Sequence, residues 1–551
     1  MEGKTEISFV NTGRRAPNAV RLRTWPNAFG SCAHRHLNVR RVSGARVSGW
    51  RQRCTALANA SKAAAVLAVG LSLGGCNDDP GEESHSSSAP AASPAAGRPA
   101  SPARQRNPRD WPRFGFDSGR TNAAAGGARL DPGAVAGLRR RRVPLPGTVD
   151  SSPIYLEDVK VGGAVHDVFF LTTTYGRTIA LDAHSARMLW TFSPARIAAW
   201  EGSSQITTAS PVASAGGRYV FATSPDGRVH KLAVASGREA PGWPVAVTLD
   251  PTHEKLGTAL NLDRGRAIAT TGGYFGDAPP YQGHVVVIDA SSGRRRGIFN
   301  ALCSDRKELL EPPSCDESGA AIWGRAGAVV EPRNGRLLVA TGDGRYDGKV
   351  HWGDSVLELT PDAHELVGSF TPRNQEELES GDVDLGSSAP ALLPGRLAVQ
   401  AGKEGVVQLL DLARLPRGGT AALIQRLRGP GGVFSAPAVL RRGEGRALVF
   451  YATSAGTFAY SLHSRRLELT WTNDSAGTSP VLAMGLLWVY DHVEGALNVY
   501  RPLSGKRVAR LPAGPGHWNS PIVAGGRVAL PEGDANSHER SGVLNLFEPA
   551  G

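Results

Sequence analysis

A unit of similar sequence recurs along the chain, and this repeat limits the possible folds more than any other feature. Each unit opens on a Ser-Pro-like step, as at Ser152-Pro153, and runs through an apolar strand to an X-Gly turn such as Asp226-Gly227. A second strand ends near Leu-Asp, as at Leu181-Asp182, and a Ser-Gly turn follows, as at Ser236-Gly237. Repeats of this kind are typical of solenoids and propellers. Eight units start, near residues 151, 209, 258, 326, 387, 434, 478 and 519.

Each step of the unit has a physical reason. Glycine supplies the positive φ of a tight hairpin, and the Asp after Leu accepts backbone hydrogen bonds from the next turn. Units often end on Trp, as at Trp190 and Trp471, where a large ring fills the space between neighbouring sheets. We therefore predict an all-β, eight-bladed β-propeller of four-stranded antiparallel blades, although the third and fourth units lack the Ser-Pro opening. The last unit looks incomplete, so we expect segment 109–148 to supply its missing strand.

The charge distribution argues against a nucleic-acid-binding protein. The chain has 551 residues and a formal net charge of +12 from 62 Lys and Arg and 50 Asp and Glu. Residues 1–75 hold 12 of the basic and 2 of the acidic residues, so the remaining 50 and 48 leave a net charge of only +2. No basic stripe with interleaved aromatics is visible in the sequence of the body, and we expect no nucleic-acid partner.

The first 75 residues resemble an export leader. The run Ala63–Leu73 is apolar, follows Arg51, Arg53 and Lys62, and has the length of a signal-peptide core rather than of a membrane span. Leu73-Gly74-Gly75-Cys76 follows it and looks like a bacterial lipobox. We predict cleavage before Cys76 and lipidation of its thiol. The alternative is a buried apolar helix that ends in Gly-Gly-Cys.

These features divide the chain into three parts. Residues 1–75 are the leader and signal peptide, which is long enough to indicate a start assigned too early. Residues 76–108 are the lipidated Cys and a tether rich in Ser, Ala and Pro, expected to be disordered. Residues 109–551 form the propeller. We expect an exported lipoprotein, periplasmic or at the cell surface, held at a membrane through Cys76.

Cysteine usage agrees with export. Of five Cys, Cys32 and Cys54 lie in the leader and Cys76 is the lipid site, which leaves Cys303 and Cys315. An even pair in an oxidising compartment predicts one disulfide that closes a short loop. The alternative is two free thiols. The sequence contains no zinc-like or haem-like Cys pattern, so neither a structural metal cluster nor a fused cytochrome is expected.

Two motifs resemble the quinoprotein dehydrogenase family, and the resemblance extends over roughly 109–551. Asp110–Gly115, with the sequence DWPRFG, looks like the opening of that family, and Gly176–Trp190 looks like its blade repeat. The family implies a propeller that binds pyrroloquinoline quinone and calcium and oxidises an alcohol or polyol. Non-enzymatic propellers share the same repeat, among them an outer-membrane assembly lipoprotein, so the repeat alone does not imply an activity.

The resemblance suggests roles for individual residues. Trp323 matches the Trp on which the quinone lies flat, and Lys403 matches a basic residue that contacts the quinone oxygens. Asp343 stands where the family has a calcium-binding Asn, and an Asp oxygen is also a hard ligand. Asp384 matches the catalytic base, chosen over Asp382 by its distance to the next motif. For each residue the alternative is structural: a packing Trp, a solvated Lys and loop or turn carboxylates.

The sequence departs from the family at two points. The family's adjacent Cys-Cys pair is absent, and its calcium-binding Gly-x-Glu-x-Gly is replaced by Gly272–Asp277, without a Glu. Asp277 is the nearby carboxylate that could substitute as a metal ligand. We therefore expect weaker calcium and quinone binding than in the true dehydrogenases, or none without Asp277.

Two functions remain open at this point. The first is an oxidoreductase that passes electrons to a separate acceptor. The second is a non-catalytic scaffold that binds another protein of the cell envelope. A sugar hydrolase or lyase has no motif to support it. In either case the fold predicts that Trp323, Asp343, Asp384 and Lys403 converge on one mouth of the ring.

Overall fold

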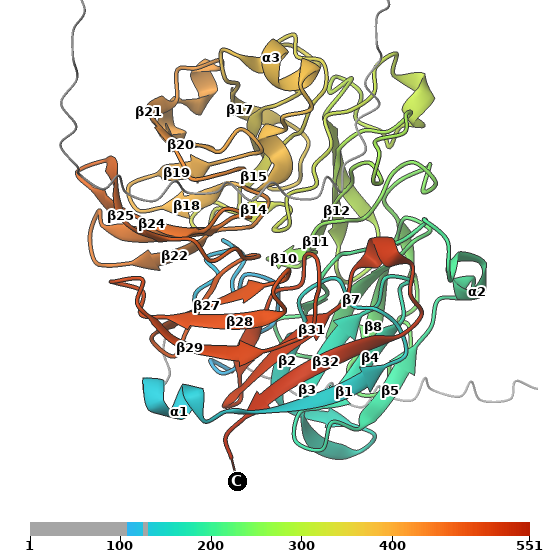
Figure 1. Ribbon diagram of the computed structural model, residues 1–551. Helices are drawn as coiled ribbons and strands as arrows, with labels where there is room; N and C mark the ends of the chain where they lie inside the picture. Colours follow the sequence, from blue (N-terminus) through green and yellow to red (C-terminus); the bar gives the residue numbers. More distant parts are fainter. Residues whose placement is uncertain (1–106, 125–129, 551) are drawn as a thin grey trace, which may run out of the picture. The chain divides into compact units, whose positions relative to one another are not determined.

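The computed structural model describes residues 107–124 and 130–550, so the predicted leader, lipidated Cys76 and tether lie outside the described residues. The described chain forms eight antiparallel sheets of four strands each, arranged as the blades of a β-propeller (Figure 1). The predicted fold class and blade number are therefore confirmed. Each inner strand begins three or four residues after its predicted unit start, because the Ser-Pro step precedes the strand.

The blades follow one another along the chain. Blades 1 to 4 contain β2 (Ile154–Val161), β3 (Ala164–Thr172), β4 (Thr178–Asp182) and β5 (Met188–Phe192); β6 (Val212–Ala213), β7 (Tyr219–Ser224), β8 (Arg228–Ala233) and β9 (Val245–Ala246); β10 (Asn261–Asp263), β11 (Arg266–Thr270), β12 (His284–Asp289) and β13 (Arg295–Asn300); β14 (Val329–Val330), β15 (Leu337–Ala340), β16 (Val356–Leu359) and β17 (Leu366–Phe370).

The second half repeats this order. Blades 5 to 8 contain β18 (Ala391–Leu393), β19 (Leu397–Gln400), β20 (Val406–Asp411) and β21 (Leu423–Arg428); β22 (Ala438–Arg441), β23 (Ala447–Ala452), β24 (Thr457–His463) and β25 (Arg466–Asn473); β26 (Val481–Ala483), β27 (Leu486–Asp491), β28 (Ala496–Tyr500) and β29 (Arg507–Pro512); β30 (Ile522–Ala524), β31 (Arg527–Glu532), β32 (Gly542–Glu548) and β1 (Arg139–Leu145).

Helices occur only as short pieces of the described chain. They are α1 (Pro132–Ala136), α2 (Ile197–Trp200), α3 (Gln375–Ser380) and the 3₁₀ turns η1 (Pro312–Ser314), η2 (Leu385–Ser387), η3 (Leu412–Arg417) and η4 (Ala535–Ser537). Among the described residues, no helix has the length and apolar character needed to cross a membrane.

The ring is closed by strands from the two ends of the domain. β1 pairs with β32 in antiparallel register from Arg139 opposite Glu548 to Leu145 opposite Gly542. The incomplete last blade therefore receives its outer strand from segment 109–148, as predicted, and that blade has no missing strand.

Neighbouring blades pack through contacts that recur from one repeat unit to the next. The indole Nε1 of Trp190 donates to the carbonyl of Val234 in blade 2, and Trp471 makes the same bond to Pro502 in blade 7, each at 2.8 Å. A Cβ on Gly237 would lie 2.6 Å from the Trp190 ring. The Gly of the Ser-Gly turn is thus required both for its positive φ and for the approach of the preceding blade's Trp.

Segment 110–124 lies across the centre of the ring, which the sequence did not predict. Trp111 bridges to Tyr155 in blade 1, and Ala123 bridges to Leu482 in blade 7. The buried guanidinium of Arg120 donates to the carbonyls of Phe114, Ala259 and Leu260. We call 110–124 the plug, because it bonds to inner strands from both sides of the ring.

Because neighbouring strands are antiparallel, the connections between them lie on two opposite faces of the ring. Connections from a blade's second to third strand, and from its outer strand to the next blade, lie on one face, which we call the loop face. The remaining turns lie on the other, the turn face. The loop face carries long segments such as 301–328, whereas the turn face has turns as short as Gly162-Gly163. The predicted catalytic, cofactor and metal residues and the two disulfide cysteines all lie on the loop face.

Candidate functional site

Four consecutive loop-face connections carry the predicted site residues. Trp323 lies between β13 and β14, and Asp343 lies between β15 and β16. Asp384 lies between β17 and β18, and Lys403 lies between β19 and β20. The structure brings these four side chains together at the mouth of the ring, from blades 4 and 5 and the connections that lead into them.

Lys403 links the group. Its Nζ lies 2.8 Å from Oδ2 of the buried Asp384, contacts the exposed carboxylate of Asp382, and lies 5.5 Å from the centre of the Trp323 ring. Burial lowers the pKa of Lys403, but the two carboxylates outweigh it and raise the pKa overall. The ammonium is therefore charged, and Asp384 has a fixed cationic partner beside an aromatic face.

Asp343, Asp382 and Asp384 form a carboxylate triad. Their ligand oxygens lie within 4.8 Å of one another, and the backbone NH of Asp343 donates to Oδ1 of Asp384 at 2.8 Å. Burial and the neighbouring Asp384 carboxylate raise the pKa of Asp343 to about 9. Like charges held this close favour either a shared proton or a bound cation.

A second layer of residues fixes the triad. Asp354 is fully buried, and its Oδ1 accepts a hydrogen bond of 2.9 Å from the NH of Leu385, next to Asp384. Burial raises the pKa of Asp354 to about 7, partly opposed by hydrogen bonds from the NH of Leu385 and the side chain of Gln375. A Cβ on Gly342 would lie 2.9 Å from Asp384 Oδ1 and 3.2 Å from Trp323 Nε1. Gly342 therefore lets the carboxylate and the indole meet.

Asp277 does not join the triad. It is exposed in the β11–β12 connection and hydrogen-bonds with Tyr281. Desolvation of the Asp277 carboxylate, and then the charges of Asp384 and Asp382, raise the pKa of Asp277. The carboxylate of Asp277 therefore interacts electrostatically with the triad without belonging to it. Its role as a metal ligand stays a prediction, while Asp382 supplies the third close carboxylate.

A row of aromatic rings crosses the mouth away from the triad. The centres of Trp323 and Phe434 are 6.2 Å apart, and Phe434 stacks on Trp518 at 5.9 Å. His517 lies against Trp518 at 4.5 Å. These side chains come from the connections that lead into blades 4, 6 and 8.

The far end of the row holds a second polar cluster. Asp150 is buried, and its carboxylate accepts hydrogen bonds from His517 Nδ1 at 2.8 Å and from the NH groups of Trp518 and Ala535. Burial raises the pKa of Asp150, but the charge and hydrogen bond of His517 outweigh it and lower the pKa to about 2. Asp534 lies 3.3 Å from His517 Nδ1. Within residues 107–124 and 130–550, His517 Nε2 makes no hydrogen bond.

Two cations lie near this cluster. Arg325 is buried and donates to the carbonyls of Asp150, Thr208 and Gly257. Burial lowers the pKa of Lys255 to about 8, partly opposed by the charge of Asp150. The mouth therefore combines carboxylates, cations and aromatic faces, which suits a planar polar ligand.

Sequence reasoning missed Asp150, Phe434, Trp518 and His517, although the repeat contains a signal for three of them. Asp150 and Trp518 each stand two residues before the Ser of a Ser-Pro opening, and Phe434 stands two residues before Ala436-Pro437. This position lies near the end of the connection from the outer strand of one blade to the inner strand of the next, and it faces the mouth. Reading it in every unit would have found the aromatic row, whereas nothing in the sequence singles out His517.

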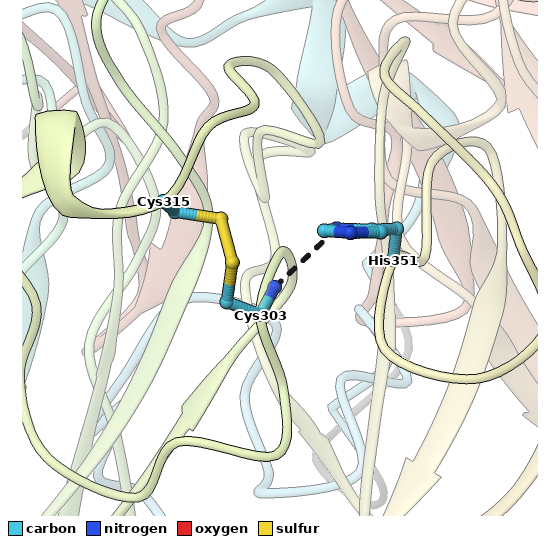
Figure 2. A group of neighbouring side chains, drawn as sticks. All are labelled: Cys303, Cys315 and His351. Carbon is cyan, nitrogen blue, oxygen red and sulfur yellow. Dashed lines mark hydrogen bonds between the residues drawn. A yellow bond between two sulfur atoms is a disulfide. The ribbon is translucent and has the colours of Figure 1, made fainter.

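The predicted disulfide is present. Cys303 and Cys315 are joined within the 301–328 loop, with Cα atoms 6.1 Å apart, and His351 Nδ1 accepts from the NH of Cys303 at 3.5 Å (Figure 2). The thiols are used in this bond, so the neighbouring His351 orients the loop rather than completing a metal site.

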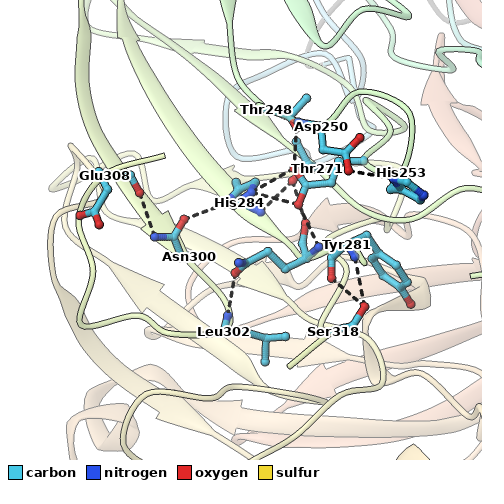
Figure 3. A network of polar contacts seen from close by, with 12 residues as sticks. Thr248, Asp250, His253, Thr271, Tyr281, His284, Asn300, Leu302, Glu308 and Ser318 are labelled. Atoms are coloured by element: carbon cyan, nitrogen blue, oxygen red, sulfur yellow. Dashed lines mark hydrogen bonds and ion pairs between the residues drawn. The ribbon is translucent and has the colours of Figure 1, made fainter. Parts of the chain in front are cut away.

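A buried network supports the loops around blade 3. Glu254 and His284 are fully buried, with His284 Nε2 3.1 Å from the carboxylate and Nδ1 2.7 Å from Asn300 (Figure 3). Burial lowers the pKa of His284, but Glu254 outweighs it and raises the pKa overall. The same Glu254 accepts from the NH of Gln282, whose side chain accepts from the NH of Leu302. This network connects the loops of Lys255, Asp277 and Cys303.

Comparisons with known proteins identify the fold. No protein-family model and no curated protein matches the chain. Among solved structures, it is similar to quinohemoprotein alcohol dehydrogenase from Comamonas testosteroni, with 15% identity, a TM-score of 0.56 and 80% of each chain covered. It is also similar to quinohemoprotein alcohol dehydrogenase ADHIIG from Pseudomonas putida HK5, with 14% identity, a TM-score of 0.61 and 80% of each chain covered. A europium-containing methanol dehydrogenase gives 14% and 0.58, with 80% of this chain and 98% of that chain covered. At these identities the likeness establishes a shared propeller fold.

Proposed function

We propose that the mouth of the loop face is a quinone- and cation-dependent centre that oxidises an alcohol or polyol. The observation that carries the proposal is the contact of Lys403 with both Asp384 and the Trp323 ring. This places an acid–base group, a cation and a flat aromatic surface in one cluster. The similar folds support it, since two are quinohemoprotein alcohol dehydrogenases and one contains europium.

The residues present fit both groups. The three triad carboxylates are hard oxygen donors, suited to calcium or to a lanthanide ion. The buried Asp354 lies behind them and holds the backbone next to Asp384 through the NH of Leu385. Trp323 offers an aromatic face and Lys403 a donor for anionic oxygens. Pyrroloquinoline quinone, when bound, would supply the two-electron acceptor that no side chain can provide.

The protein's own groups have separate tasks in this proposal. Asp384, paired with Lys403, would take the hydroxyl proton of the substrate at a carboxylate oxygen. Asp343 and Asp382 would hold the cation. Asp354 and Gly342 position Asp384 by the contacts described above. Phe434 and Trp518 extend the apolar surface on which the carbon part of the substrate would rest.

The test is a spectroscopic titration of the purified protein with pyrroloquinoline quinone and calcium, and separately with terbium, whose luminescence reports transfer from a nearby Trp. We expect binding that Trp323→Ala and Asp343→Asn both lose. Asp289→Asn on the turn face is the matched control and should bind as the unmodified protein does. Quinone binding that survives both mouth substitutions would contradict the proposal.

A binding scaffold is the second candidate, and one observation favours it. Lys403 already neutralises Asp382 and Asp384, so part of the triad is satisfied without a metal ion. In this reading the mouth recognises an envelope protein and performs no reaction. It predicts no quinone or terbium binding, with Lys403→Met lowering stability instead.

We also propose that the chain is an exported lipoprotein, anchored through Cys76. The sequence Leu73–Cys76 after an apolar run supports this, as does the disulfide, which is typical of exported proteins. Metabolic labelling with a radioactive fatty acid should mark the protein in its host, and Cys76→Ser should abolish the label. Equal labelling of that variant would contradict lipidation.

A further inference from the structure

The near-neutral propeller is strongly polarised between its two faces. The strand connections of the turn face contain 15 Lys and Arg and 5 Asp and Glu, a net charge of +10. Those of the loop face contain 11 Lys and Arg and 24 Asp and Glu, a net charge of −13. Charges of one sign gathered on one face set up a field that orients the whole molecule at a charged surface.

The basic residues are spread widely and remain available. Blades 1 to 7 each contribute at least one, and most are exposed arginines at turn tips, such as Arg187, Arg218, Arg294, Arg442 and Arg501. Within residues 107–124 and 130–550, none of these five makes an ion pair. The turn face is therefore a broad cationic surface rather than a set of internal salt bridges.

One hollow on this face is lined by arginines. A cavity of about 690 Å³ opens between blades 3 and 4, bordered by Arg266, Arg294, Arg295 and Arg296, with Asp289 and Asp362. Arg296 pairs with Asp289, whereas the Arg294 guanidinium has no partner among the described residues. Several guanidinium groups around a hollow suit a phosphate group.

The chain enters the ring on the turn-face side. Asn107 Nδ2 donates to Glu157 at 2.7 Å, and four residues later Trp111 pairs with Tyr155. Because β2 runs from the loop face to the turn face, Glu157 is nearer the turn face than Tyr155 is. Asn107, the first described residue, therefore lies toward the cationic side of the ring.

We propose that the turn face docks on an anionic phospholipid membrane and so directs the acidic loop face away from it. The width of the cationic surface matches a planar partner, and each basic residue near such a surface adds favourable energy. A protein partner would need apolar anchors, and few large apolar side chains are exposed on this face: Leu503 in a described turn of blade 7, with Val165 and Met188 beside the turns of blade 1. Lipidation of Cys76 would add to this docking but is not required for it.

The test uses the chain from Gly97 onward, which omits the basic leader. All the described residues, 107–124 and 130–550, lie within this chain, and β1 and β32 close the ring, so it keeps every described contact. Its cosedimentation is measured with phosphatidylcholine vesicles, with and without phosphatidylglycerol. We expect binding only to the anionic vesicles, and its loss when salt rises from about 0.05 to about 0.5 M.

Two matched triple variants assign the binding to a face. Arg294→Glu with Arg417→Glu and Arg442→Glu reverses three exposed turn-face charges, and Arg196→Glu with Lys349→Glu and Arg373→Glu reverses three on the loop face. The first should weaken vesicle binding at least about tenfold. The second should leave it unchanged within about threefold, with equal thermal stability as a check on folding.

Three outcomes would overturn the proposal. They are equal binding to neutral and anionic vesicles, equal loss in both triple variants, and tighter binding to soluble DNA or to an acidic protein than to anionic vesicles at the same salt. None of these results depends on quinone binding, so they are separable from failure of the proposed function.

Discussion

The two faces of the ring are made from the same repeat but differ in almost every property. The turn face has mostly short turns, a net positive charge and contacts between blades such as the Trp190–Val234 hydrogen bond. The loop face has long connections, a net negative charge and buried charged groups such as Asp150, Asp384 and Glu254. The difference indicates that the short turns of one face serve mainly to connect the strands, whereas the longer connections of the other face can form a site.

The plug lies between the two faces, and disrupting its contacts should have the largest effect on the free energy of unfolding. Arg120→Met leaves the carbonyls of Phe114, Ala259 and Leu260 without their donor. We expect a loss of about 3–5 kcal/mol in the free energy of unfolding, measured by denaturant titration. Arg187→Met on the turn face is the control, expected within about 0.5 kcal/mol of the unmodified protein. Equal effects would mean that the plug does not hold the ring together.

Two aspartates, Asp150 on the loop face and Asp289 on the turn face, allow a direct comparison of how much a carboxylate stabilises each face. Asp150→Asn on the loop face removes a buried charge that binds His517 and two NH groups, and should cost about 3 kcal/mol. Asp289→Asn removes a turn-face Asp that serves its own hairpin, and should cost about 1 kcal/mol.

The pH dependence identifies the Asp150 contribution. Because the folded pKa of Asp150 is lowered to about 2, its stabilisation is present above the unfolded value of about 3.9 and is lost as pH falls between the two. Thermal unfolding should therefore show a steeper acid loss in the unmodified protein than in Asp150→Asn. Parallel curves would rule out a buried ionised Asp150.

The disulfide strengthens only the loop face. Cys303→Ser with Cys315→Ser opens a loop with a sequence separation of 12 and should lower the free energy of unfolding by about 2–3 kcal/mol in the chain-entropy model. Non-reducing peptide mapping of the unmodified protein provides the companion measurement. Two alkylatable thiols there, or no change in stability, would contradict the bond.

Lys255 should give a pH effect of the same sign as that of Asp150, but in the alkaline range. Burial lowers its folded pKa to about 8, below the unfolded value of about 10.4, so the unfolded chain binds more protons between these values. Stability should therefore rise with pH from about 8 to about 10, and Lys255→Met should remove that rise. A rise that persists in the variant would assign it to another group.

The fold was predictable because its information is local and repeated. Ser-Pro openings, X-Gly hairpins and the Trp190 type of cap recur at intervals, so eight units and their closure by an N-terminal strand could be read before any contact was known. The plug was not predictable. Arg113 and Arg120 lie in a segment without periodicity, and their partners are backbone carbonyls and an amide more than 100 residues away.

The site could be predicted only in part. Trp323, Asp343, Asp384 and Lys403 stand in family-like motifs, and they meet as expected. Asp277 was chosen because it replaced a missing Glu in sequence, but distance in space favours Asp382 for the triad. Asp150 and His517 pair across 367 positions, which no local pattern can show. The charge difference between the faces was hidden for the same reason, since turn residues from seven of the eight blades contribute to it.

The most direct test of the proposed centre is a crystal structure of the protein grown with pyrroloquinoline quinone and calcium. The account predicts quinone density against the Trp323 ring and a cation bonded to Asp343 and Asp382 on the loop face. A mouth that stays free of both under saturating ligand, with Lys403 still bonded to Asp382 and Asp384, would contradict it.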